Sequence, residues 1–145
     1  MDAETAAKAT EAPVDATRKA LGNSTFSGGY IELWDRGRQY VADVLFTFDH
    51  PVDADRFRQF ELGYLSTSPA ASTYTYPLIP NATGFALNGV SRAHPYLFCQ
   101  GTWFTLGAEV FNIYHCDPDM PVDPSLVDAV SAAQYRRAAV TPSPG

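Results

Sequence analysis

Apolar and polar side chains alternate along residues 40–49, and a period of two predicts a β-strand. Asp43 and Asp49 belong to one set of alternating positions. The other set is Tyr40, Ala42, Val44, Phe46 and Phe48. A shorter alternation begins at Tyr30 and ends at the turn residues 35–38. We therefore expect two consecutive strands joined by a reversal.

Helical spacing of apolar residues occurs twice after these strands. Asp53 can cap a helix whose apolar residues recur on one face, with Arg56, Arg58 and Glu61 outside that face. The apolar residues are Phe57, Phe60, Tyr64 and Leu65. A second helix is expected to begin with Asp123 as N-cap and Pro124 at the first helical position, and to run toward Arg137.

Three further strands are predicted, at residues 85–90, 96–106 and 109–116. The proline-containing stretch that ends at Asn81 is compatible with either a long loop or an irregular edge strand. The resulting order is β-β-α-β-β-β-α. This order predicts an α+β fold, in which an antiparallel sheet of about five strands carries two helices packed on one face.

The domain boundaries follow from composition. Residues 1–29 are rich in Ala, Thr, Ser and Gly and are predicted to form a flexible N-terminal tether, with a short helix from Asp15 to Leu21. Residues 30–139 form the single α+β domain, and residues 140–145 a disordered tail.

The two cysteines can be tested by strand register. Gly107 suits the first central position of a two-residue type II′ turn, and a Gly107-Ala108 turn places Cys99 opposite Cys116 at a non-hydrogen-bonded pair. Such pairs have the short Cα separation that a disulfide needs. The same register sets Tyr114 across from Gly101, as an aromatic cover for a bare glycine. A bulge at Gly101 would break the register, and two reduced core cysteines are the alternative.

Composition narrows the class of protein. Hydrophobic residues make up 46%, an ordinary share for a globular protein, and charged residues 18%, a share on the low side, so the chain is expected to fold. The net charge of -6 and the scattered basic residues argue against a nucleic-acid partner. The start of the chain lacks the features of a signal peptide. It therefore indicates either a cytosolic protein or a mature domain whose leader was removed, and a disulfide favours the second.

Candidate chemistry is sparse. Asp43 and Asp49, with Glu32 on the neighbouring strand, form a carboxylate set that suits acid or base catalysis, and equally a solvated sheet face. His115 belongs to the densest group of candidate metal ligands, which also contains Asp117, Asp119 and Asp123. Its spacing matches no zinc or EF-hand pattern, and no nucleotide motif occurs, so we expect neither a metal nor a cofactor.

The aromatic segment before Asn81 is the most suggestive surface. It carries Tyr74, Tyr76, Leu78 and Ile79 between prolines. Such a segment either covers a core or offers apolar anchors to a protein partner or an apolar ligand.

Three segments, residues 46–57, 103–111 and 122–135, resemble small outward-facing domains of exported lipoproteins from actinobacteria. The resemblance implies a lipid-tethered domain of the cell envelope, although the lipid-accepting cysteine and leader of that family are absent from this sequence. The resembling segments are patterns of strand, helix cap and core, and the resemblance assigns no catalytic residue.

These observations favour a non-enzymatic extracytoplasmic binding or accessory domain of the bacterial cell envelope. A membrane tether through a removed leader is part of this hypothesis. One alternative is a small hydrolase or isomerase that uses Asp43, Asp49 or His115. Another is a structural subunit of a membrane protein complex.

Overall fold

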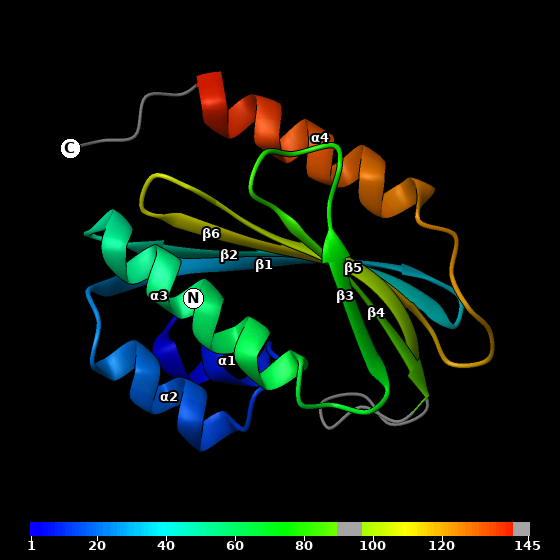
Figure 1. The fold of residues 1–145 in the computed structure, drawn as a ribbon, viewed down its shortest axis with the longest axis horizontal. Coiled ribbons are helices and arrows are strands. Elements are labelled where there is room, and N and C mark those ends of the chain that lie inside the picture. Colours follow the sequence, from blue (N-terminus) through cyan, green and yellow to red (C-terminus); the bar gives the residue numbers. More distant parts are fainter. Residues whose placement is uncertain (90–96, 141–145) are drawn as a thin grey trace.

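The computed structural model describes residues 1–89 and 97–140 of the chain (Figure 1). Val90 and Tyr96, at the ends of two predicted strands, lie outside the described residues, as do residues 141–145 of the predicted tail.

In the described residues, six antiparallel strands form one sheet, in the spatial order β1-β2-β6-β5-β4-β3. They are β1 (Phe26–Arg36), β2 (Gln39–Phe48), β3 (Ala71–Thr75), β4 (Thr83–Gly89), β5 (Leu97–Leu106) and β6 (Glu109–Asp117). The predicted α+β class and the antiparallel sheet are confirmed. The strand missing from the predicted order is β3, an edge strand in the stretch that the sequence leaves open between loop and strand.

Four helices lie in the described residues, and they cover both faces of the sheet. They are α1 (Ala3–Lys8), α2 (Val14–Gly22), α3 (Pro51–Leu65) and α4 (Ser125–Val140). Figure 1 shows α4 on one side and the other helices on the opposite side. The prediction of two helices on one face is therefore wrong. In β2 the four consecutive residues 41–44 are all buried, which requires cover on both faces.

The core between the sheet and α3 is built on aromatic rings. The Phe46 ring lies 4.8 Å from that of Phe57 on α3 and 6.1 Å from that of Trp103 on β5, measured between centroids. All three side chains are almost completely buried. Their contact fixes α3 across β2, β6 and β5.

A second core lies between the sheet and α4. Phe104 and Phe111 stack across the β5–β6 hairpin at 4.8 Å, and Tyr135 of α4 meets Phe104 edge-on. Val127 of α4 and Ile79 of the β3–β4 connection also belong to this cluster. The connection after β3 therefore serves as core cover on the α4 side.

The N-terminal segment is folded onto the α3 side of the sheet. Ala6, Ala7 and Ala12 have no exposed surface, and the amino group of Met1 donates to the carbonyl of Gly29 at 2.8 Å. The short helix predicted for residues 15–21 is present as α2. Residues 1–29 thus contain α1, α2 and the start of β1, packed against the core. Their use as a membrane tether stays a prediction.

This packing changes two predictions for α3. The helix begins at Pro51, and Asp53 accepts hydrogen bonds from the backbone and hydroxyl of Thr25 instead of capping the helix. Glu61, predicted to lie outside the apolar face, is 2% exposed and accepts a bond of 2.9 Å from the Thr17 hydroxyl of α2. Both differences arise because the N-terminal segment folds over α3, which no local pattern in α3 reveals.

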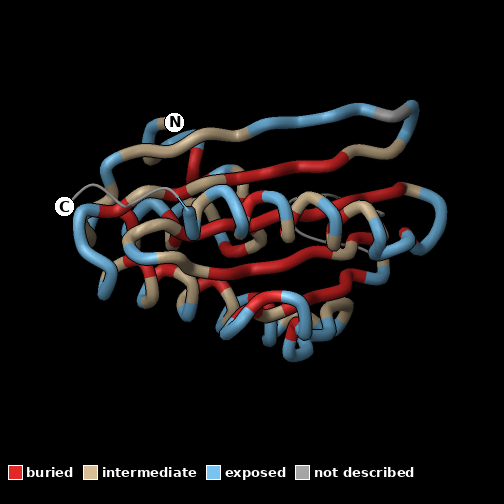
Figure 2. Tube along the Cα trace, turned by 90° about the horizontal axis from the view of Figure 1, so that it is seen from above, coloured by how far each residue is buried: buried red, intermediate tan, exposed pale blue. Residues whose placement is uncertain are grey.

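β1 forms one edge of the sheet and is open to solvent near its end. Figure 2 shows this stretch as an exposed outer rim of the molecule. Leu33 is 60% exposed and Trp34 44% exposed, and they lie on opposite faces of the strand. Each face of this edge therefore offers an apolar side chain to solvent.

Candidate functional site

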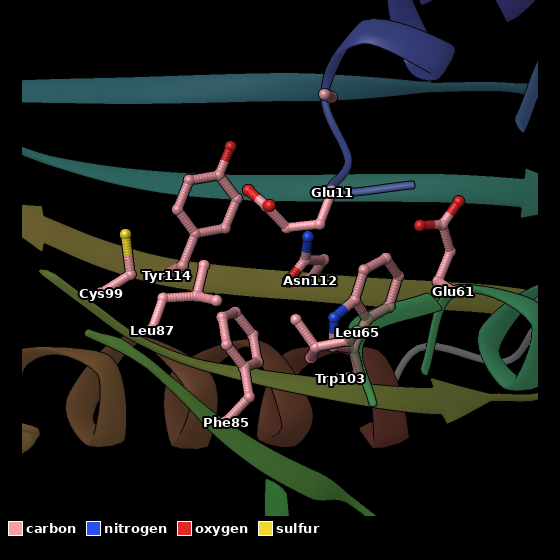
Figure 3. Close-up of a pocket in the computed structure, with 10 residues that line it drawn as sticks. Glu11, Glu61, Leu65, Phe85, Leu87, Cys99, Trp103, Asn112 and Tyr114 are labelled. Carbon is pink, nitrogen blue, oxygen red and sulfur yellow. The ribbon is translucent and has the colours of Figure 1, made fainter. Parts of the chain in front are cut away.

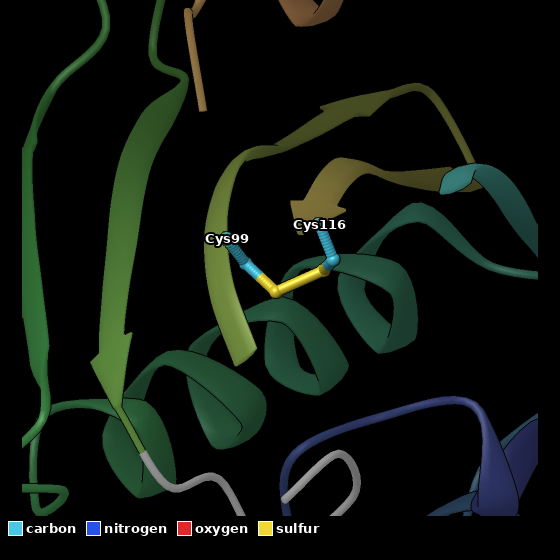
Figure 4. The surroundings of a disulfide bond; sticks show 2 residues. All are labelled: Cys99 and Cys116. Carbon is cyan, nitrogen blue, oxygen red and sulfur yellow. A yellow bond between two sulfur atoms is a disulfide. The ribbon is translucent and has the colours of Figure 1, made fainter. Parts of the chain in front are cut away.

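The disulfide predicted from register is present. Cys99 and Cys116 are paired across β5 and β6, with Cα atoms 4.2 Å apart and a sequence separation of 17. Gly107 has a φ of 56°, as a type II′ turn requires at its first central residue. Figure 4 shows the bond on the face of the hairpin that points toward α3.

The aromatic ring that packs on Gly101 comes from a different strand than the sequence predicts. Tyr114 pairs with Gly101 as expected, but a methyl group at Gly101 would lie 2.3 Å from the Phe85 ring. Phe85 is the partner of Gly101 on β4. The glycine thus makes room for an aromatic ring from the neighbouring strand on its other side.

The predicted partner surface divides into buried and exposed residues. Tyr76 is 5% exposed and Ile79 2% exposed, and both belong to the core under α4. Tyr74 and Leu78 are exposed, at 42% and 55%. A role in partner contact stays a prediction, and only Tyr74 and Leu78 present enough surface for it.

Tyr76 also connects the β3–β4 segment to α4. Its hydroxyl donates to Oδ1 of Asp128. Burial raises the pKa of Tyr76 well above its usual range, and the acceptor Asp128 raises it further. Tyr76 therefore acts as a structural link between this segment and the helix.

An open groove lies between α4 and the first two strands. Its volume is about 410 Å³, within the range of small-molecule sites. The strands contribute Glu32, Trp34 and Asp43. The helix contributes Ala129, Val130, Ala133, Gln134 and Arg137. The groove combines an apolar helix wall with two carboxylates and an exposed indole.

Asp43 is the buried polar group of this groove. Its side chain has no exposed surface, and its Oδ2 accepts a hydrogen bond from the Gln134 amide. Burial raises the pKa of Asp43, while the Gln134 bond acts in the opposite direction. The negative charge of Glu32 raises this pKa as well, and the positive charge of Arg137 lowers it.

Tyr30 and α4 hold these groups in place. The Tyr30 hydroxyl accepts from Gln134 at 3.2 Å and from Arg137 at 3.1 Å. Arg137 donates in addition to the Gln134 side-chain oxygen. This chain of bonds links the helix to β1 and positions the Gln134 amide over Asp43.

The residues considered for catalysis are not gathered in one cleft. Asp49 is exposed and follows the last residue of β2, six residues or about 20 Å of extended chain beyond Asp43. His115 bonds through Nε2 to Gln39 at 2.9 Å, and the Gln39 amide donates to Asp117. Asp43 does not belong to the His115 network, so the arrangement supplies no joined acid and base.

The group considered for metal binding is used locally. Asp117 accepts from the backbone of Asp119 and Met120, and Asp119 forms an ion pair with Arg38. Asp123 caps α4 by accepting from the backbone of Ser125. Within residues 1–89 and 97–140, no three His, Cys, Asp or Glu side chains form a metal-binding group.

A small internal pocket lies beneath the N-terminal segment. Its volume is about 20 Å³, enough for one or two water molecules. Figure 3 shows Glu11, from the segment between α1 and α2, reaching the same space as Asn112 and Tyr114 of β6. Burial raises the pKa of Tyr114 to about 12. The pocket is too small for an organic ligand while the N-terminal segment is in place.

Fold and site together define a six-stranded antiparallel α+β domain with helices on both faces and an open groove under the C-terminal helix. Its fold is similar to that of the extracellular domain of PknH from Mycobacterium tuberculosis. The TM-score is 0.54 at 13% sequence identity, over 90% of this chain and 73% of that domain. At this identity the similarity concerns the fold alone.

No family model matches the chain, and no curated protein matches its sequence. None of the helices in the described part of the chain is both long enough and apolar enough to span a bilayer.

Sequence reasoning found Asp43 and Glu32 but missed the residues that complete the groove. Gln134 and Arg137 are three residues apart and therefore share a face of α4, which the sequence shows. It does not show that this face lies against β1 and β2. In the sequence, Trp34 belongs to the alternation that begins at Tyr30 and carries no further signal.

Proposed function

We propose that this chain is a non-enzymatic binding domain that works outside the cytoplasm, in the bacterial cell envelope or secreted from the cell. The binding site in this proposal is the groove between α4 and strands β1 and β2. The observation that carries it is the combination of an open space of about 410 Å³ with the buried carboxylate of Asp43. Pockets with a few oriented polar groups in an apolar wall are typical ligand sites.

The extracytoplasmic part of the proposal rests on the disulfide. Structural disulfides persist in oxidising compartments and are rare in the cytosol. The similar PknH domain is an extracellular domain, which agrees with this compartment. The lack of a joined acid and base at Asp43, Asp49 and His115 supports a binding role over hydrolysis or isomerisation.

The groove can be tested by NMR with three probes of equal chain length: hexanol, hexylammonium and hexanoate. Titration of the isotope-labelled protein should shift the amide signals of residues 32–34, 43 and 129–137 with at least one probe. The variant Ala133→Trp fills the groove from the helix side and should abolish these shifts. If none of the three probes shifts this set of signals, the groove is not a ligand site and the proposal fails.

The compartment can be tested through the disulfide. Reduction should lower the free energy of unfolding by about 3 kcal/mol, the value expected for a closed loop of this length. Denaturant melts with and without reductant, together with mass spectrometry of alkylated thiols, measure this effect. Free thiols in the oxidised preparation would remove the support for an oxidising compartment.

A further inference from the structure

The groove under α4 has a chemical character that narrows its ligand class. Two of its side chains, Asp43 and Glu32, are carboxylates that face each other across β1 and β2. Like charges at directly opposed positions of an antiparallel pair are unfavourable. Arg137 is the one cation among the groove residues, so the lining carries a net negative charge of one.

Asp43 is only partly satisfied by the protein. Its Oδ2 accepts from Gln134, whereas Oδ1 is buried and has no hydrogen-bond partner among the described residues. A carboxylate offers about four acceptor positions, and a buried one is costly unless donors or a positive charge compensate it. The Nη2 atom of Arg137 donates to the Tyr30 hydroxyl and to the Gln134 side-chain oxygen. Oδ1 is therefore an acceptor among the groove residues that the described protein groups leave unpaired.

The remaining walls of the groove are apolar or aromatic. Trp34 lies two residues from Glu32 on the same face of β1 and is 44% exposed. An exposed indole attracts organic cations through its ring face. Ala129, Val130 and Ala133 form the opposite wall on α4. Together these features suit a ligand with a positive end and an apolar body.

We propose that the groove binds a small organic ammonium ion, with its charged end toward Asp43 and Glu32 and its apolar body between Trp34 and the wall of α4. This inference rests on the proposed function, because it specifies the ligand class of the same groove. The overall charge of -6 also favours the approach of cations over anions.

The test compares affinities of the same three probes, measured by amide shifts and by the fluorescence of Trp34. The other tryptophan, Trp103, is buried in the core and serves as an internal reference. Hexylammonium should bind at least tenfold more tightly than hexanol, and hexanoate should not bind. Asp43→Asn should reduce the preference for hexylammonium over hexanol to less than threefold.

Two further variants separate charge from fold. Asp49→Asn removes an equal charge at an exposed position just after the end of β2 and outside the groove, and it should keep the tenfold preference. Glu32→Gln alters an exposed side chain, so it preserves the fold and should weaken hexylammonium binding at least threefold. The Glu32 variant thus decides the question even if Asp43→Asn fails to fold.

The outcomes distinguish the two proposals. If hexanol or hexanoate binds in the groove as tightly as hexylammonium, the groove remains a ligand site but the ammonium assignment is overturned. If no probe binds there, the proposed function itself fails. A capped lysine peptide that binds more tightly than hexylammonium would also overturn the assignment to a small molecule and indicate a protein partner.

Discussion

Gly101 lies in β5 between the Phe85 ring of β4 and the backbone of Ile113 in β6. An added methyl group would meet the Phe85 ring at 2.3 Å and the carbonyl oxygen of Ile113 at 2.8 Å. Gly101→Ala should therefore lower the free energy of unfolding by about 1–3 kcal/mol, the usual cost of overpacking a core. Denaturant titration measures this change.

Gly63 provides the matched control for that substitution. It lies on the exposed side of α3, with no atom within 4 Å of an added methyl group. Gly63→Ala should raise stability by about 0.5–1 kcal/mol, because alanine loses less backbone entropy in a helix. Equal effects of the two substitutions would contradict the packing described at Gly101.

The charge of Asp43 makes stability depend on pH. Because burial raises its pKa in the folded state, the folded protein binds a proton there more tightly than the unfolded chain does. This contribution to stability is present at acid pH and is lost as pH rises through the folded pKa. Asp43→Asn should accordingly be more stable than the parent at pH 7, and the gain should shrink as the pH falls and the carboxyl group is protonated in both states.

Thermal or denaturant unfolding at several pH values tests this expectation. Asp49→Asn removes an exposed carboxylate just after the end of β2 and should show no comparable gain at pH 7. A parent protein whose stability increases with pH relative to Asp43→Asn would show that Asp43 is stabilised as a carboxylate by its neighbours.

The register of the β5–β6 hairpin was predictable from single residues. Gly107 suits the turn, and counting residue pairs outward from this turn sets Cys99 opposite Cys116. The cover of Gly101 was not predictable in the same way. A hairpin pattern specifies only the partner within the hairpin, and Phe85 comes from the strand on the other side.

At the scale of elements, the segment between β3 and β4 is anchored to α4 by Tyr76. Tyr76→Phe removes the hydroxyl that donates to Asp128 and should cost about 1.5–3 kcal/mol, as for other hydrogen bonds to charged groups. Tyr74→Phe removes a hydroxyl whose 3.3 Å bond to Gln100 is exposed to solvent, so it should change stability by less than about 0.5 kcal/mol. Chemical denaturation of both variants measures the difference, and equal losses would contradict the assignment of Tyr76 to the core.

The contact between α2 and α3 gives another prediction for the elements. Thr17→Val keeps the shape of the side chain but removes the hydroxyl that donates to the buried carboxylate of Glu61. It should lower stability by about 1–3 kcal/mol and accelerate hydrogen exchange in α2. Thr73→Val, at an exposed position of β3, is the matched control and should stay within about 0.5 kcal/mol of the parent. Unchanged exchange in α2 would show that Glu61 does not hold this helix.

Element boundaries were predicted well where caps and turns are local. Asp123 accepts a hydrogen bond from the backbone of Ser125 as a capping side chain would, but α4 begins at Ser125, one residue beyond the predicted first position at Pro124. The predicted cap of α3 at Asp53 is wrong. A side chain suited to a cap can instead accept from a distant backbone group, here that of Thr25. Sequence spacing alone cannot distinguish these two uses of an aspartate.

At the scale of the whole molecule, the sequence did not reveal that the sheet is covered on both faces. The alternation in β2 pointed to one apolar face, but the other face also carries Val41 and Leu45. Helix α4 covers that second face, and the groove exists only because of this arrangement. The spatial order of strands and helices depends on contacts between distant segments, which local patterns do not encode.

The disulfide also determines how the molecule would respond to mechanical force applied at its two ends. Tension that enters β5 passes through the sulfur atoms to β6, so the chain between Cys99 and Cys116 carries no load. A sequence separation of 17 residues corresponds to about 60 Å of extended chain. Single-molecule stretching should give a fully extended length shorter by about this amount in the oxidised protein than after reduction. The hairpin at the centre of the sheet would then stay closed while the strands around it are pulled away.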